Sequence, residues 1–259
     1  MQKTSDLYQT LLAQRHSTEV RLSIGESGRL ITKRGEPITF GGTSILVGAS
    51  GADSGYDESS LVSLRTDVQL FSEDTVTVGS CVSGEIDVQM LKPSGDIPRQ
   101  ARLVPYLRLT NGHIHSEWIQ KGVYYIDTRL VDYDHSGIQY LSLHGYDSML
   151  KAEQDYPSSK LNWPASDIEV VEEIATFLNV PVDARTYQYL NRSYPIQYPS
   201  DYSCRDVLGY IASMYAGCFV MSDLGELRFV PFYDIPRETR YLVTQGRQPI
   251  LFGGDRILV

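Results

Sequence analysis

The sequence contains few cysteines and no long apolar run, and each of these absences excludes a class of protein. Its three cysteines are odd in number and follow no metal-ligand spacing, which excludes a disulfide framework and a four-cysteine zinc site. We expect Cys81, Cys204 and Cys218 to be small buried hydrophobic residues. No run of about 18 apolar residues occurs, so the sequence predicts no membrane-spanning helix. Its polar start, 1–6, does not predict a signal peptide, and synthesis in a cytosol is expected.

Basic residues are in deficit, with 23 Lys and Arg against 32 Asp and Glu and a net charge of -9. This balance argues against a protein that binds nucleic acid through its phosphates. The negative net charge suits a channel through which DNA passes without binding. The alternative is that it serves only to keep the protein soluble. The 18 tyrosines far outnumber the 7 phenylalanines and 2 tryptophans. Tyrosine favours interfaces and half-exposed sheet faces, which makes oligomerisation more plausible, but it is also a common strand residue.

One phrase of eleven residues occurs twice. Residues 37–47 return 212 positions later as 249–259, and eight of the eleven positions are identical. Each copy predicts a short strand, a Gly-Gly turn and a second strand. The repeat indicates two related sheets or barrels, or two edges of one. The alternative is a coincidence between two segments of common strand residues. The second copy is either a closing strand pair or the start of a further module. The positions that define the repeat are Phe40, Gly41, Gly42, Phe252, Gly253 and Gly254.

Strand signals dominate the first part of the chain after one short amphipathic helix predicted over 5–14. The region 48–60 has the composition of a surface loop, and 29–32 is placed to pair back onto the first strand. Asn111 and Gly112 predict a type I′ turn, because both residues tolerate the positive φ that this turn requires. The predicted strands cover 19–24, 61–71, 84–91, 101–109, 114–119, 123–132 and 138–144.

Helical periodicity begins after residue 147. Ser166 with Glu169 and Ser203 with Asp206 have the spacing of capping boxes, and an apolar helical face follows each pair. Gly217 stands where a glycine ends a helix. A tight hairpin is predicted over 218–232. The chain therefore divides near residue 147 into a mainly β portion and an α+β portion.

Few residues suggest chemistry. His113, His115 and Glu117 alternate along one predicted strand, so their side chains share a face and form a weak candidate metal site, although surface polar residues give the same pattern. His144 has Asp147 nearby in sequence, but no nucleophile elbow accompanies the pair, which favours a structural histidine. We therefore expect no catalytic residues, no metal, no cofactor and no enzyme activity.

Four segments carry a resemblance to a known family. Residues 78–88, 116–129, 144–151 and 205–217 resemble tail proteins of phages and prophages from Firmicutes-type bacteria. These belong to the baseplate-hub or tail-tip family, whose siphophage members often form the N-terminal part of a tail-associated lysin. The resemblance extends over roughly 15–232. Relatives in this family are commonly longer, with a complete second barrel.

The resemblance implies a homotrimer in the tail tip of a virion, assembled in the cytoplasm of a host bacterium. Each subunit would contribute two related β-barrel hub domains, so that three chains match a hexameric tail tube. Implied partners are a tail-tube or distal tail protein, the tape-measure protein and a tail fibre or spike. DNA would pass through the lumen without specific binding.

The expected fold is therefore α+β and mainly antiparallel β. We expect a hub-type β-barrel over 1–147, an α+β domain with two helices and a hairpin over 148–235, and closing strands or the start of a second barrel over 236–259. The expected function is a structural ring that joins the tail tube to the tip. The alternatives are the hub portion of a tail lysin whose enzyme domain lies beyond this chain, and a metal-dependent hydrolase built on His113, His115 and Glu117.

Overall fold

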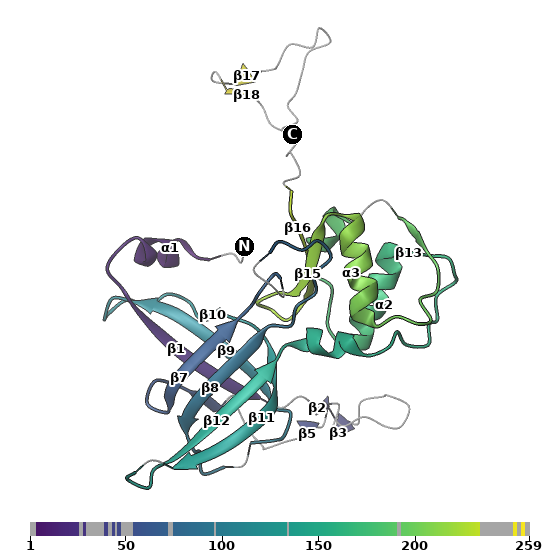
Figure 1. The fold of residues 1–259 in the computed structure, drawn as a ribbon. Helices are drawn as coiled ribbons and strands as arrows, with labels where there is room; N and C mark the ends of the chain where they lie inside the picture. Colours follow the sequence, from purple (N-terminus) through teal and green to yellow (C-terminus); the bar gives the residue numbers. More distant parts are fainter. Residues whose placement is uncertain are drawn as a thin grey trace.

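The computed structural model describes most of the chain as a curved β-sheet joined to a smaller lobe of helices and hairpins (Figure 1). The helix α1 (Asp6–Leu12) precedes the sheet, with Ser5 as its N-cap. No helix in the described ranges has the length and apolar character needed to cross a membrane. The described residues are 4–25, 28–29, 39–40, 43–44, 46–47, 54–71, 75–95, 97–133, 135–190, 193–233, 251–252 and 255–256.

The main sheet is entirely antiparallel and follows the order β6-β1-β9-β11-β12-β8-β7, with the short β10 beside β9. This agrees with the expected mainly antiparallel α+β fold. The strands are β1 (Ser17–Gly25), β6 (Ser54–Tyr56), β7 (Leu61–Asp67), β8 (Glu85–Leu91), β9 (Arg102–Thr110), β10 (Ile119–Gln120), β11 (Tyr124–Tyr133) and β12 (Gln139–Tyr146).

The two edge strands of this sheet, β6 and β7, are consecutive in the chain and are separated only by 57–60. The sheet therefore rolls around one apolar core, to which Leu22 of β1, Met90 of β8 and Leu143 of β12 all contribute. Within the described residues β6 and β7 do not pair with each other, so the strands form no closed ladder and the expected closed barrel is not present.

The lobe begins directly after β12 and has its own apolar core, which the helices and the second hairpin enclose. The largest side chains in this core include Phe219, Phe229 and Ile174, all fully buried. Its elements are the 3₁₀ helix η1 (Ser148–Glu153), β13 (Ala165–Ser166), α2 (Asp167–Leu178), η2 (Thr186–Gln188), β14 (Pro195–Ile196), α3 (Cys204–Met214), β15 (Gly217–Met221) and β16 (Leu227–Pro231).

Both predicted capping boxes are confirmed. The Ser166 hydroxyl accepts from the N–H of Glu169, and the Glu169 carboxylate accepts from the N–H of Ser166. Ser203 and Asp206 form the same pair of hydrogen bonds at the start of α3. The expected end of α3 at Gly217 is wrong. The left-handed residue is Ala216, with φ of 48°, and Gly217 already begins β15.

The predicted turn after β9 also differs from expectation. Only Gly112 has a positive φ, of 93°, whereas type I′ requires it at two successive residues, so the type I′ prediction is wrong. The strand expected over 114–119 is reduced to a single bridge at His115 and to β10. The reason is local, because the Ser116 hydroxyl accepts from the N–H of Leu109 and replaces a ladder bond.

Each copy of the repeated phrase forms its own strand pair, and the two pairs have the same register. β3 (Thr39–Phe40) pairs with β4 (Thr43–Ser44), and β17 (Leu251–Phe252) pairs with β18 (Asp255–Arg256), with Phe40 and Phe252 at equivalent positions. Gly41, Gly42, Gly253 and Gly254 lie outside the described residues. β2 (Gly28–Arg29) pairs with β5 (Leu46–Val47) rather than with β1, which corrects the expected pairing at Arg29. The rest of that predicted segment, 30–32, lies outside the described residues.

Asp147 joins the sheet to the lobe. Its carboxylate accepts from the N–H of Gly84 at 2.8 Å and from the N–H of Met149 at 2.9 Å, and its own N–H donates to the Gly84 carbonyl. Arg205 of α3 donates to the hydroxyl of Ser83 and to the carbonyl of Met149 beside it. Burial raises the pKa of Asp147 from 3.8 to about 6, although both N–H bonds oppose the shift.

A second contact at this junction requires glycine. A Cβ on Gly79, whose φ is 83°, would lie 2.6 Å from the carbonyl oxygen of Gly209 on α3. A Cβ on Gly209 would lie 2.8 Å from the carbonyl oxygen of Gly79. The two backbones therefore touch directly, and the segment before β8 lies against the lobe.

The raised pKa of Asp147 predicts a pH-dependent stability. Between pH 3.8 and about 6 the folded state keeps a proton that the unfolded state has released, so stability falls as pH rises through this window. The contribution is on the order of 3 kcal/mol, at 1.36 kcal/mol per pKa unit. Urea unfolding of the wild type and Asp147→Asn from pH 3.5 to 7 measures it. We expect the wild type to lose stability relative to the variant across this window, and parallel curves would contradict the assignment.

Candidate functional site

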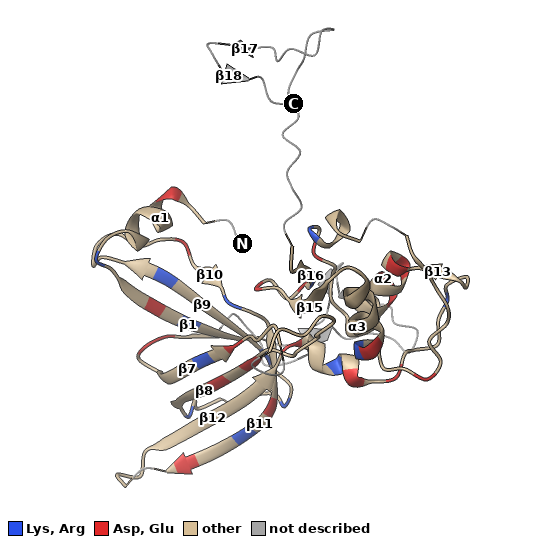
Figure 2. Ribbon diagram, turned by 45° about the horizontal axis from the view of Figure 1, so that its top comes forward, with Lys and Arg blue, Asp and Glu red and all other residues tan. Residues whose placement is uncertain are grey.

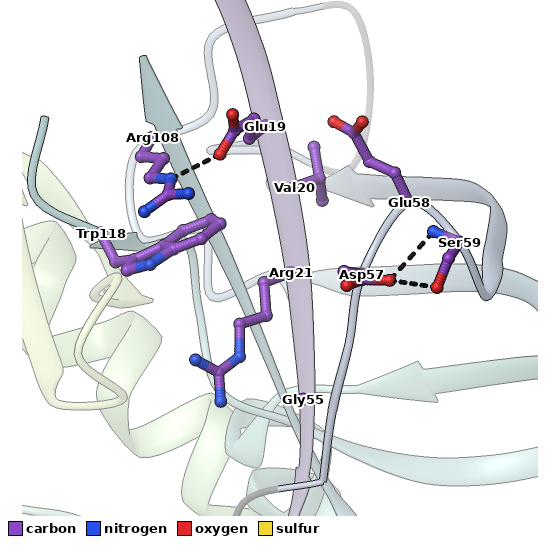
Figure 3. Close-up of a pocket in the computed structure, with 9 residues that line it drawn as sticks. All are labelled: Glu19, Val20, Arg21, Gly55, Asp57, Glu58, Ser59, Arg108 and Trp118. Atoms are coloured by element: carbon purple, nitrogen blue, oxygen red, sulfur yellow. Dashed lines mark hydrogen bonds and ion pairs between the residues drawn. The ribbon is translucent and has the colours of Figure 1, made fainter. Parts of the chain in front are cut away.

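An open groove lies at the corner where the chain passes from β6 to β7 (Figure 3). It has a volume of about 490 Å³. Three elements border it: the first half of β1, the turn after β6, and the strand β9 with the loop that follows it. The residues that line it are Glu19, Val20, Arg21, Gly55, Asp57, Glu58, Ser59, Arg108 and Trp118.

One wall of the groove is a fixed cluster of charges. The Nε of Arg108 donates to Oε2 of Glu19 at 2.6 Å, across the β1–β9 pair. The guanidinium lies over the Trp118 ring at 4.4 Å from its centroid, which adds a cation–π contact. Nδ1 of His115 is 3.5 Å from the other oxygen of Glu19. Glu19 therefore has Arg108 on one oxygen and His115 near the other, and Arg108 is held over the indole.

The opposite wall is the turn that ends β6. Asp57 accepts from the N–H of Ser59 at 2.9 Å and from its hydroxyl at 2.5 Å. These two bonds, the hydroxyl first, lower the pKa of Asp57 below its usual value. The carboxylate therefore stays ionised and closes the turn that joins the two sheet edges.

Arg21 differs from the other charged residues of the groove. Its side chain extends over Gly55, where a Cβ would lie 2.1 Å from Nε of Arg21. No described residue accepts a hydrogen bond from its guanidinium or pairs with it. The glycine thus makes room for a half-buried cation that forms no salt bridge with another residue of the described ranges.

The structure separates the three residues of the weak metal candidate. His113 lies in the turn and not on a strand, His115 faces Glu19, and Glu117 accepts from the N–H and hydroxyl of Ser5. These two bonds, the hydroxyl first, lower the pKa of Glu117. Among the described residues no three potential ligands come together at a point where they could hold a metal ion.

The other candidate residues lie in structural positions. His144 pairs with Asp87 at 2.7 Å on the neighbouring strand, not with Asp147. All three cysteines are buried and free, as expected. Burial raises the pKa of Cys81 to about 12 and those of Cys204 and Cys218 to about 11, so all three are thiols at neutral pH.

The sequence reasoning did not single out the groove. Glu19, Arg21 and Arg108 are ordinary alternating charges on strands, and only their cross-strand register brings them together with Trp118. The exposed apolar tip of the β11–β12 hairpin was missed for the same reason. There Leu130 is 60% exposed and Tyr133 66% exposed, in a segment that the sequence predicts as an ordinary strand.

The Glu19–Arg108 pair should couple measurably. Both side chains are a little over a quarter exposed, so the ion pair is only partly screened by solvent. A double-mutant cycle with Glu19→Gln and Arg108→Gln is expected to give a coupling of about 1 kcal/mol in urea unfolding, reduced in 1 M NaCl. The exposed pair of Arg65 and Asp67 provides the control, with a coupling near zero expected. Equal couplings for the two pairs would contradict this description.

Comparisons with known proteins identify the fold. No protein-family model and no curated protein matches the sequence. Among solved structures, a 43 kDa tail protein of prophage MuSo2 from Shewanella oneidensis matches 88% of this chain with a TM-score of 0.51 and 14% identity. A tail protein from Neisseria meningitidis matches 90% with a TM-score of 0.47 and 9% identity, and prophage tail protein gp18 from Listeria monocytogenes matches 88% with a TM-score of 0.39 and 7% identity.

This chain spans 60%, 54% and 55% of the lengths of those three proteins. At such low identity the likeness concerns the fold alone, and the MuSo2 protein supports the comparison because its TM-score exceeds 0.5. Sheet and lobe together therefore have the fold of a prophage tail protein.

Proposed function

We propose that this chain is a structural protein of a phage tail, located in the virion and without catalytic activity. The observation that carries the proposal is the match of sheet and lobe to the prophage MuSo2 tail protein over 88% of the chain. Fold alone does not fix function, so the proposal also draws on the surface of this chain.

The surface supports a role in assembly. β11 and β12 form a hairpin that projects from the body of the sheet (Figures 1 and 2). From Asp127 to Tyr133 every residue of β11 is exposed, including Leu130 and Tyr133. In the described part of the chain, β9 pairs with β11 only at Tyr124 and Tyr125, so the outer half of β11 has one unpaired edge. Exposed apolar edges of this kind are normally covered by a partner.

The finer form of the proposal is a homotrimeric baseplate-hub or tail-tip ring that joins the tail tube to the tip. Its channel would admit the tape-measure protein and DNA, and the net charge of -9 favours passage of DNA without binding. A tail-tube or distal tail protein and a fibre or spike would be its neighbours. The resemblance of the sequence to hub proteins and the exposed hairpin support this form. The alternative is the hub portion of a tail lysin, with the enzyme domain outside this chain.

Sedimentation equilibrium and negative-stain imaging test the ring. We expect a species three times the 29.1 kDa of one chain, with a central opening. The double substitution Leu130→Lys and Tyr133→Lys should abolish assembly, because it places charge on the exposed edge of β11 without touching either core. Leu224→Lys, at a position 52% exposed in the lobe, is the matched control and should leave the trimer intact.

One outcome would overturn the proposed ring, and a second would remove only the role of the β11 edge. A wild-type protein that stays monomeric at micromolar concentration and does not bind tail-tube protein would contradict the proposed ring. A trimer that survives the β11 substitutions with unchanged affinity would remove the role of this hairpin but leave the ring in place. Thermal unfolding of each variant shows whether the fold is retained.

A further inference from the structure

The outer edge of β1 is only partly used. β6 pairs with β1 at three residues, Leu22 to Ile24, and the chain then turns away at Asp57 toward β7. Ser17 to Arg21 pair with β9 on one side, and no described strand lies on the other. These five residues thus present a row of backbone N–H and C=O groups, and the groove lies beside Glu19, Val20 and Arg21.

The groove also contains one arginine that forms no salt bridge with a described residue. Arg108 is neutralised by Glu19, whose second oxygen faces His115. Arg21 has no such partner among the described residues, and its effect on Asp57 is the weakest of those that lower the pKa of that group. A half-buried guanidinium gains most from a carboxylate, which it can bind through two parallel hydrogen bonds.

The position of Arg21 is set by the fold. Its guanidinium lies against Gly55 of β6, at the point where β6 stops covering β1. In Figure 3 it points to the same side of β1 as Trp118 and Arg108, whereas Asp57 and Glu58 stand on the other side of the strand. A ligand that continues the line of β6 along β1 would meet the backbone edge and Arg21 together.

We propose that this groove is a strand-acceptor site for an extended segment of a partner polypeptide that carries a carboxylate side chain. The segment adds to β1 at Ser17–Arg21, and its carboxylate binds the Arg21 guanidinium. Strand addition supplies main-chain hydrogen bonds that are independent of sequence, and the arginine supplies selectivity. A nucleic acid does not fit, because binding its run of phosphates takes several Lys and Arg, and this groove has two arginines, of which Arg108 is paired with Glu19.

The inference does not depend on the proposed ring. A strand acceptor can serve any assembly, and the residues that form it are remote from the β11 edge tested above. Loss of the ring and loss of the acceptor site are therefore separately measurable, the first by sedimentation and the second by peptide binding.

Trp118 provides the readout. The chain has two tryptophans, so Trp163→Phe leaves Trp118, at the groove, as the only indole. The probe is a set of capped heptapeptides of Ser, Thr and Val with a single Glu moved through the seven positions. We expect at least one peptide to change Trp118 fluorescence saturably, and its counterparts with Gln or Lys in place of Glu to bind about tenfold more weakly, a loss of about 1.4 kcal/mol.

Three variants in the Trp163→Phe background test the assignment. Arg21→Gln should weaken the Glu peptide about tenfold and leave the Gln peptide unchanged. Gly55→Ala should do the same without removing a charge, since its Cβ would displace the Arg21 side chain. Arg65→Gln removes an exposed arginine of the neighbouring β7, 75% exposed and outside the groove, and should leave binding unaltered.

Amide hydrogen exchange tests strand addition directly. The bound peptide should slow exchange at amides within Ser17–Arg21 of the wild type and of Arg65→Gln. The proposal fails if no Glu peptide binds at millimolar concentration, if binding is indifferent to Arg21, or if exchange on β1 is unchanged. It also fails in favour of a second copy of this chain if the unliganded protein self-associates and Arg21→Gln abolishes that association.

Discussion

A four-residue turn joins the two edges of the main sheet, and most of the architecture follows from that covalent constraint. Because β6 and β7 are consecutive, the strand at one edge has to reach the strand at the other, and a flat sheet of this order cannot do so. The rolled sheet encloses a single apolar core. The same turn takes the chain away from β1 after Tyr56, so the groove and the unpaired part of β1 result from the way the sheet rolls.

The features that sequence predicted well are those decided within a few residues. The capping boxes at Ser166 and Ser203 need only a serine and an acid three positions apart, and both helices begin where expected. Strand character over 84–91 predicted β8, whose Ile86, Val88 and Met90 alternate toward the core. These signals survive because the physical interaction that produces each one is local.

The failures concern contacts that the spacing of residues along the chain does not reveal. The Ser116 hydroxyl replaces a ladder bond and shortens the strand expected after Asn111, so His113 and His115 do not share a strand face. Trp118 reaches the groove only because β10 pairs back onto β9. Neither event leaves a trace in the spacing of residues along the chain. The match to a tail protein at 14% identity also shows how little of the fold is visible in residue identities, since few identical side chains are needed for a shared topology.

The junction between sheet and lobe has a mechanical consequence. Asp147 and Gly84 exchange bonds at the neighbouring ends of β12 and β8, and Arg205 attaches the lobe to the same point through Ser83 and Met149. A force applied to the lobe therefore enters the sheet at two paired strands in its interior, and also beside β9, where the Asp223 carbonyl of the lobe accepts from Gln120 and Gly122. Seven residue pairs connect β12 to β8. Because these antiparallel strands meet the lobe at the same end, a pull along their axis moves both strands together and does not shear the pairs between them. The lobe is thus positioned to pull β8 and β12 as a unit, so that tension passes to their outer neighbours β7 and β11.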